Sequence, residues 1–162
     1  MKFVDEFRDF YPEAFEEIDA NVPPPKTEEM DVSCFVGSDH AHDKITRRSV
    51  TWIVIFIGRT PVYFSSKRQG AIETSTYGVE FCAMKSAVEE VISVRYMLRC
   101  LRVKITYASW LCGDNLGVIE NCTISSSLLK KKHVAIACHK TRECAAAGVI
   151  HPAKVLTQGI KE

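Results

Sequence analysis

The sequence predicts an α/β fold with a mixed sheet of about five strands, the first three antiparallel, flanked by helices. Three observations lead to this prediction. Three β-branched and aromatic runs lie between residues 32 and 65. A long stretch with apolar residues at three- and four-residue steps follows them. Beyond residue 104, short apolar runs alternate with helical stretches. The length of 162 residues predicts one domain.

The first three strands are predicted to be consecutive along the chain. In residues 32–37, Val32 and the apolar positions two and four beyond it alternate with the other side chains, which is typical of a strand. Residues 49–57 are β-branched and aromatic, and a glycine ends them. The turn at residues 59–61 leads into a third strand over residues 62–65. Strands two and three should therefore form a hairpin.

A long amphipathic helix is predicted from about Ser75 to Arg102, with Ser75 or Thr76 as its N-cap. The remaining elements alternate strand and helix. They are a strand over residues 105–112, a short helix from Leu116, a helix over residues 130–147 ended by Gly148, and a possible fifth strand from Val149.

Composition places the chain among folded proteins without a membrane span. Hydrophobic residues are 46% and charged residues 25% of the sequence. The longest apolar run, Trp52–Ile57, is far shorter than the ~20 residues that a membrane helix needs. The acidic N-terminus does not match a signal peptide. Seven cysteines without a C-x-x-C pair indicate reduced thiols. We therefore expect an intracellular, cytoplasmic protein.

Charge divides the chain into two parts. Residues 1–30 are read as an acidic, proline-containing leader or connector, and residues 31–162 as the folded domain. Residues 1–31 hold ten acidic and three basic side chains, whereas residues 32–162 hold ten acidic and 18 basic ones. A basic body suits a polyanionic ligand, although solubility explains the same charge.

Three carboxylates occupy positions where a site could form. Asp114 follows an apolar strand and precedes a helix, the edge at which α/β sheets bind ligands. Glu80 lies in the first turns of the long helix, where the helix dipole also favours an acid. Asp39 follows the first strand. Carboxylates converging from separate elements could ligate Mg²⁺.

The sequence resembles the ribonuclease H domain at the end of copia-type LTR retrotransposon polyproteins. The matching stretches run in family order across residues 34–150 and are CFVGSDHAHDKITRRSVT, GRTPVYFSSKRQGAIETSTYGVEFCAM, CGDNLGVI and LLKKKHVAIACHKTRECAAAG. The resemblance implies a ribonuclease H fold and hydrolysis of RNA in RNA–DNA hybrids with two Mg²⁺ or Mn²⁺ ions. It also implies a reverse transcriptase domain in the same polyprotein, and a cytoplasmic, virus-like-particle or nuclear location.

The family site, four acids in the order Asp, Glu, Asp, Asp, is incomplete here. The resemblance assigns catalytic and metal-binding roles to Glu80 and Asp114. In the family, the first acid opens a D-A-D motif at the end of the first strand, and Gly37 stands at that first position. Asp39 matches the second aspartate of the same motif and is expected to substitute for the first in part. No aspartate follows Asp114, so the fourth acid is absent, and the C-terminal helix is expected to be short or missing, with Lys154 where its acid would lie. Cleavage is therefore expected to be impaired.

Hybrid binding makes fewer demands than cleavage, because basic and hydroxyl side chains suffice for phosphate contacts. An alternative to a nuclease is therefore a catalytically inactive nucleic-acid-binding remnant. Another is an interaction module whose acidic leader docks on its own basic face or on a partner. The strand aromatics could stack on bases, but their spacing is more typical of core. The expected phosphate-binding residues are Lys67, Arg68, Gln69, Ser65, Ser66, Arg47 and Arg48, with the run Lys130–Lys132 as a further candidate.

Overall fold

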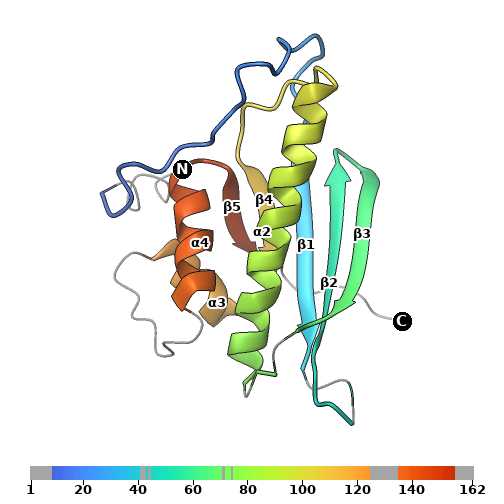
Figure 1. Ribbon diagram of the computed structural model, residues 1–162, viewed down its shortest axis with the longest axis vertical. Coiled ribbons are helices and arrows are strands. Elements are labelled where there is room, and N and C mark those ends of the chain that lie inside the picture. Colours follow the sequence, from blue (N-terminus) through green and yellow to red (C-terminus); the bar gives the residue numbers. More distant parts are fainter. Residues whose placement is uncertain are drawn as a thin grey trace.

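The computed structural model describes residues 9–40, 43, 45–70, 72–73, 75–124 and 135–155. It confirms the predicted class, an α/β domain built on one five-stranded mixed sheet with the order β3-β2-β1-β4-β5 (Figure 1). No helix of the described part is long and apolar enough to cross a membrane. The strands are β1 (Val32–Asp39), β2 (Val50–Ile57), β3 (Thr60–Arg68), β4 (Ser109–Gly113) and β5 (Ile150–Lys154), and the helices are α2 (Thr76–Cys100), α3 (Leu116–Thr123) and α4 (Ala135–Ala146).

The sheet topology directs the ends of two strands towards the start of α2. β1, β2 and β3 are antiparallel, as predicted, whereas β4 and β5 run parallel to β1. Parallel strands end at the same edge of a sheet. The C-terminal ends of β1 and β4 therefore point towards the same edge of the sheet, the lower one in Figure 1, where α2 begins.

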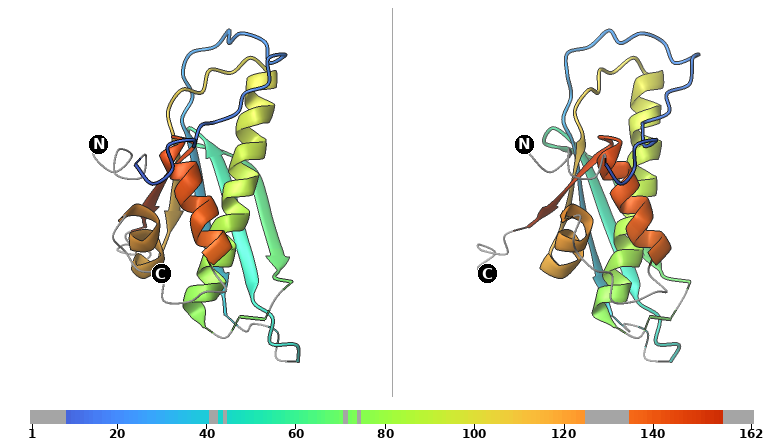
Figure 2. Two further views of the ribbon diagram at one scale, coloured as in Figure 1. Left: turned by 60° about the vertical axis from the view of Figure 1, so that its left-hand side comes forward. Right: turned by 90° about the vertical axis from the view of Figure 1, so that its left-hand side faces the viewer.

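The core lies between one face of the sheet and the helices. Figure 2 shows α2 and α4 together on that face. Alternate residues of β1 and β2, such as Cys34 and Ile55, point into the core and are fully buried. Phe81, Val88 and Val91 of α2 meet them with no exposed surface. The three- and four-residue spacing of the helix is thus the spacing of its buried stripe.

Several boundaries differ from those predicted. Ser75 caps α2 through its side chain, as expected, but β4 begins only at Ser109 because the preceding loop bonds the leader and α2 instead of a strand. The described part of the leader, residues 9–30, contains no helix. Lys154 ends a strand and does not lie in a helix. Residues 130–134 lie outside the described part.

The expectation that the strand aromatics are core is wrong for two of them. Trp52 is 45% exposed and Phe64 is 78% exposed. Both belong to the sheet face opposite α2, whereas the register places the buried Ile53 and Ile55 on the helix side. Strand alternation predicts two faces, but it does not say which face the helices cover.

Candidate carboxylate pair and nucleic-acid interface

Glu80 is a buried carboxylate one turn into α2. Glu80 is 6% exposed, and the Ser38 hydroxyl donates a 2.7 Å hydrogen bond to its Oε1. Burial raises the pKa of Glu80 above its usual 4.5, and the carboxylate of Asp114 raises it further, while hydrogen bonds from Ser38 oppose the shift. A buried acid with a raised pKa, next to a second acid, is typical of a functional site.

Asp114 lies near this site because the residue before it packs on α2. Gly113 ends β4, and a Cβ on it would lie 3.6 Å from Sδ of Met84, one turn beyond Glu80 on α2, which is ordinary van der Waals contact. This contact sets the turn after β4 against the first turns of α2. Asn115 then caps α3 by accepting a hydrogen bond from the Val118 amide. The exposed Asp114 carboxylate is therefore held beside the buried Glu80.

Gly37 and Asp39 belong to the other face of β1. Ser38 points towards α2, so strand alternation directs positions 37 and 39 away from it. Gly37 lies opposite Trp52 in the antiparallel register. A Cβ built on Gly37 would lie 2.5 Å from Cζ2 and 2.7 Å from Cε2 of the Trp52 indole. The ring therefore fills the space into which a side chain at position 37 would project.

These residues do not fit a two-metal centre. Within the described ranges, no three or more His, Cys, Asp or Glu side chains are grouped closely enough to hold a metal ion. The pair Glu80 and Asp114 offers two carboxylates, and burial raises the pKa of Glu80. Two divalent ions need several anionic oxygen ligands. The described residues thus supply ligands for one ion at most.

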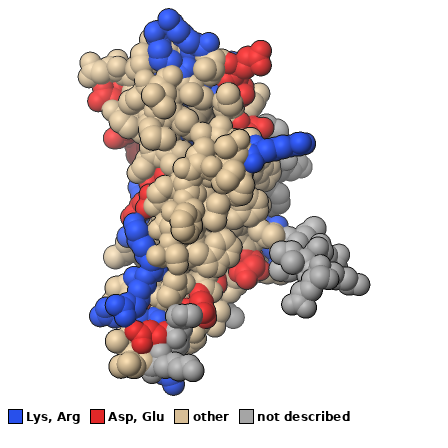
Figure 3. All heavy atoms as spheres, turned by 90° about the vertical axis from the view of Figure 1, so that its right-hand side faces the viewer, with Lys and Arg blue, Asp and Glu red and all other residues tan. Residues whose placement is uncertain are grey.

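The predicted phosphate-binding side chains surround the end of β3, at the same edge of the sheet. Figure 3 looks onto the β3 side and shows Lys and Arg at the top and the lower left, with uncharged atoms over most of the middle. Lys67 is 74% exposed and lies 3.8 Å from Glu90 of α2. Arg68 donates a 2.8 Å bond to Asp43. Arg47 is exposed on the β1–β2 loop, with a positive φ of 57°.

The other predicted phosphate-binding side chains are less available, because several are half-buried or hydrogen-bonded within the domain. The Gln69 amide donates to Thr51 Oγ1 of β2 and to the Val79 carbonyl of α2, so its two hydrogen bonds link the end of β3 to both elements. Arg48 is half-buried, and its Nε has no hydrogen-bond partner. Ser66 is exposed and Ser65 is half-buried. Gln69 therefore positions the strand, and the run Lys130–Lys132 lies outside the described residues.

Asp43 explains the polar loop after β1. Its carboxylate accepts bonds from the amides of Ile45 and Thr46, from the Thr46 hydroxyl and from Arg68. The Thr46 bonds in particular hold the pKa of Asp43 well below its usual range. Asp43 closes the turn and fixes Arg68, so this acid is structural.

Sequence reasoning missed one group of interacting residues, Glu16 with Arg95 and Arg99. The two arginines are four residues apart on α2, which places them on one helix face. That spacing was a visible signal, but the position of Glu16, 79 residues from Arg95, was not.

Comparisons with known proteins agree with this fold. The Arabidopsis thaliana "Retrovirus-related Pol polyprotein from transposon RE1" is 24% identical over 128 residues, and the one from transposon RE2 is 21% identical. The RNase H1 of the archaeon Halobacterium salinarum NRC-1 superposes with a TM-score of 0.59 at 14% identity, over 78% of this chain and 86% of that one. The chain has a ribonuclease H-like fold, and its sequence is similar to retrotransposon Pol polyproteins.

Two further structures share the fold of this ribonuclease H-like domain. LC11-RNase H1 in complex with an RNA/DNA hybrid has a TM-score of 0.61 at 11% identity, over 79% of this chain and 87% of that chain. The foamy viral protease-reverse transcriptase in complex with RNA/DNA hybrid has a TM-score of 0.54 at 12% identity, over 88% of this chain and 20% of that chain. No protein-family model matches the chain. Each Pol match covers 79% of this chain and spans 9% of the polyprotein.

Replacing Glu80 with Gln should stabilise the ribonuclease H-like domain at neutral pH. The raised pKa of Glu80 means that folding favours its protonated form, so the carboxylate destabilises the fold above that pKa. We expect Glu80→Gln to have the higher Tm at pH 7, with the difference vanishing as the pH falls to 4.5. Thermal unfolding monitored by circular dichroism between pH 4 and 8 measures this. A variant less stable than the wild type at pH 7 would contradict it.

Proposed function

We propose that this domain binds RNA–DNA hybrids as a copia-type ribonuclease H-like domain and that its cleavage of the RNA strand is impaired. Two proteins that share its fold have hybrids bound in their structures. The observation that carries the impairment is that Gly37 supplies no carboxylate at the first acid position, and the Trp52 indole fills the space beside it. A carboxylate at that position needs the same space.

The residues present favour binding over hydrolysis. Phosphate contacts require only exposed cations and hydroxyls, which Lys67, Arg47 and Ser66 provide around one sheet edge. Two-metal hydrolysis requires ligands for both ions. Glu80 and Asp114 would hold a single Mg²⁺ or Mn²⁺ ion, and Asp39 is directed to the opposite face. We therefore derive no hydrolytic step.

The similarity to Pol polyproteins also supports a partner. We infer that the domain acts beside a reverse transcriptase domain of the same polyprotein, because its relatives are Pol polyproteins and one structural neighbour is a protease-reverse transcriptase. In that setting an inactive domain still adds affinity for the hybrid through phosphate contacts.

Hybrid binding can be measured by fluorescence anisotropy with a labelled 18-base-pair RNA–DNA duplex in Mg²⁺. We expect Lys67→Ala combined with Arg47→Ala to weaken binding about 10-fold and to reduce the salt slope by about 2, because two phosphate contacts are lost. Lys140→Ala is the matched control, since Lys140 is an exposed cation on α4, paired with Glu143 and away from this edge.

The same duplex reports cleavage on a denaturing gel. The proposal predicts a bound and intact RNA strand in both Mg²⁺ and Mn²⁺. Cleavage that disappears in Glu80→Gln would overturn the impairment and show that the remaining acids suffice. A folded wild type with no affinity for the hybrid would overturn the proposed binding. The shared fold would then reflect common ancestry alone.

A further inference from the structure

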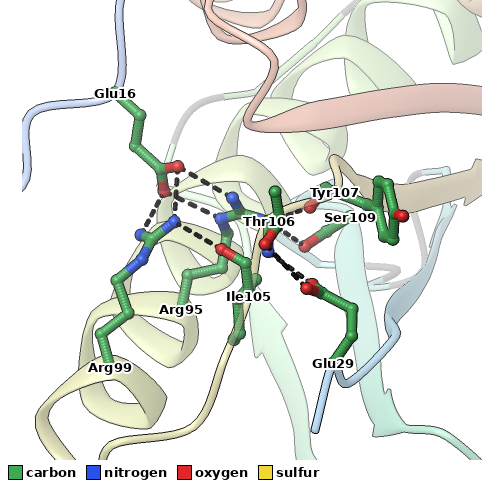
Figure 4. Close-up of polar contacts among 8 residues, drawn as sticks. All are labelled: Glu16, Glu29, Arg95, Arg99, Ile105, Thr106, Tyr107 and Ser109. Atoms are coloured by element: carbon green, nitrogen blue, oxygen red, sulfur yellow. Dashed lines mark hydrogen bonds and ion pairs between the residues drawn. The ribbon is translucent and has the colours of Figure 1, made fainter. Parts of the chain in front are cut away.

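The carboxylate of Glu16 lies between two guanidinium groups of α2. Arg95 donates to both of its oxygens at 2.8 Å, and Arg99 donates to the same two oxygens at 2.6 and 2.7 Å. Figure 4 shows the three side chains facing one another, with Glu16 reaching in from the leader. One carboxylate thus receives two bidentate pairs, the strongest geometry that such groups form.

This pair of arginines also donates to acceptors other than Glu16. Arg95, whose side chain is 1% exposed, also donates to the Tyr107 carbonyl and to Ser109 Oγ, each within 2.9 Å. Arg99 donates to the Ile105 carbonyl at 3.3 Å. Those acceptors belong to β4 and the loop before it. The arginine fork, Arg95 and Arg99, therefore keeps three hydrogen-bond acceptors when Glu16 alone is replaced.

The charges at the fork do not balance. Two guanidinium groups, each +1, face a single carboxylate of −1. A phosphate dianion carries −2 and has one more oxygen for the same donors, so it matches the fork better than Glu16 does. The advantage of Glu16 is that it is attached to the chain and so is present at high effective concentration.

A cavity adjoins the fork and opens a route to it. It measures about 580 Å³ and lies between leader residues 13–18, α2 and α4, with Arg99 in its wall. Its other charged lining groups are Glu13, Glu17, Lys140 and Glu143. Three carboxylates against one lysine line the rest of the cavity, so the positive charge that an anion needs is concentrated at the fork.

We propose that Arg95 and Arg99 form a phosphate-binding site, which Glu16 occupies as a ligand carried on the leader and which takes a phosphate group when Glu16 is withdrawn. The leader then acts as a strap that competes with phosphate. The fork lies 15 residues beyond Glu80 on α2, about 22 Å along the helix. The site is thus separate from the proposed hybrid-binding edge and does not depend on the proposed function.

The test uses the full chain with Glu16→Ala. Inorganic phosphate is titrated at constant ionic strength, and binding is measured by isothermal calorimetry and by thermal unfolding. We expect Glu16→Ala to bind one phosphate at least 10-fold more tightly than the wild type and to recover Tm with phosphate. Glu13→Ala, from the same leader segment and cavity wall, should behave like the wild type. Adding Arg99→Ala to Glu16→Ala should abolish the phosphate response.

Three results would overturn the proposal: no gain in phosphate affinity in Glu16→Ala, an equal gain in Glu13→Ala, or a gain that survives Arg99→Ala. If Glu16→Ala does not fold, Glu16→Gln keeps the side-chain size, removes the charge and carries the same expectations. A parallel titration with phenyl phosphate separates free phosphate from a phosphate ester, since only the ester places an apolar body in the cavity. Hybrid affinity should stay unchanged in all Glu16 variants.

Discussion

Gly37→Asp should destabilise the domain by about 1–3 kcal/mol, the usual cost of inserting a side chain into occupied space. The new Cβ would lie 2.5 Å from Cζ2 of Trp52, so the indole or the strand must move. Urea denaturation measures the change. Gly70→Asp is the matched control, because nothing lies within 4 Å of a Cβ at that glycine and its φ is not positive. That control should change stability by less than ~0.5 kcal/mol.

Trp52→Ala tests whether the indole causes the loss of stability in Gly37→Asp. In the double variant with Gly37→Asp the clash is gone, and we expect a coupling energy of about 1–3 kcal/mol in the double-mutant cycle. Additive stabilities would show that Trp52 does not block position 37.

The second large effect is acid destabilisation through Glu16. Hydrogen bonds and charges from Arg95 and Arg99 outweigh the opposing effect of burial and lower the pKa of Glu16 from 4.5 to about 2. A lowered pKa stabilises the fold above pH 4.5, and this stability is lost as the pH falls through 2. The shift corresponds to about 3 kcal/mol at pH 7.

Glu16→Gln should therefore lower the free energy of unfolding by about 3 kcal/mol at pH 7 and by little at pH 2. Urea denaturation at several pH values follows the convergence of the two proteins. Glu13→Gln, a leader acid outside the arginine fork, should track the wild type across the range. A Glu16→Gln deficit that is the same at pH 2 and pH 7 would mean that packing, and not charge, holds the leader.

Local patterns were sufficient to predict most elements. The alternation in β1 and β2 and the apolar stripe of α2 appeared in the structure, since each depends on neighbours within a few residues. Ser75 proved to be the cap because a capping hydroxyl acts on an amide three positions away. The start of β4 was misplaced because its preceding loop bonds residues some 77 positions away.

The sequence by itself determined the class of fold, the order of the elements and the acids and cations that could serve a site. The tertiary structure alone decided which of them meet. It placed Asp114 beside Glu80, turned position 37 onto the face of Trp52 and brought Glu16 to the arginine fork. The physical reason is that periodicity and capping are local along the chain, whereas these encounters depend on strand order, sheet face and the path of the leader across the folded domain.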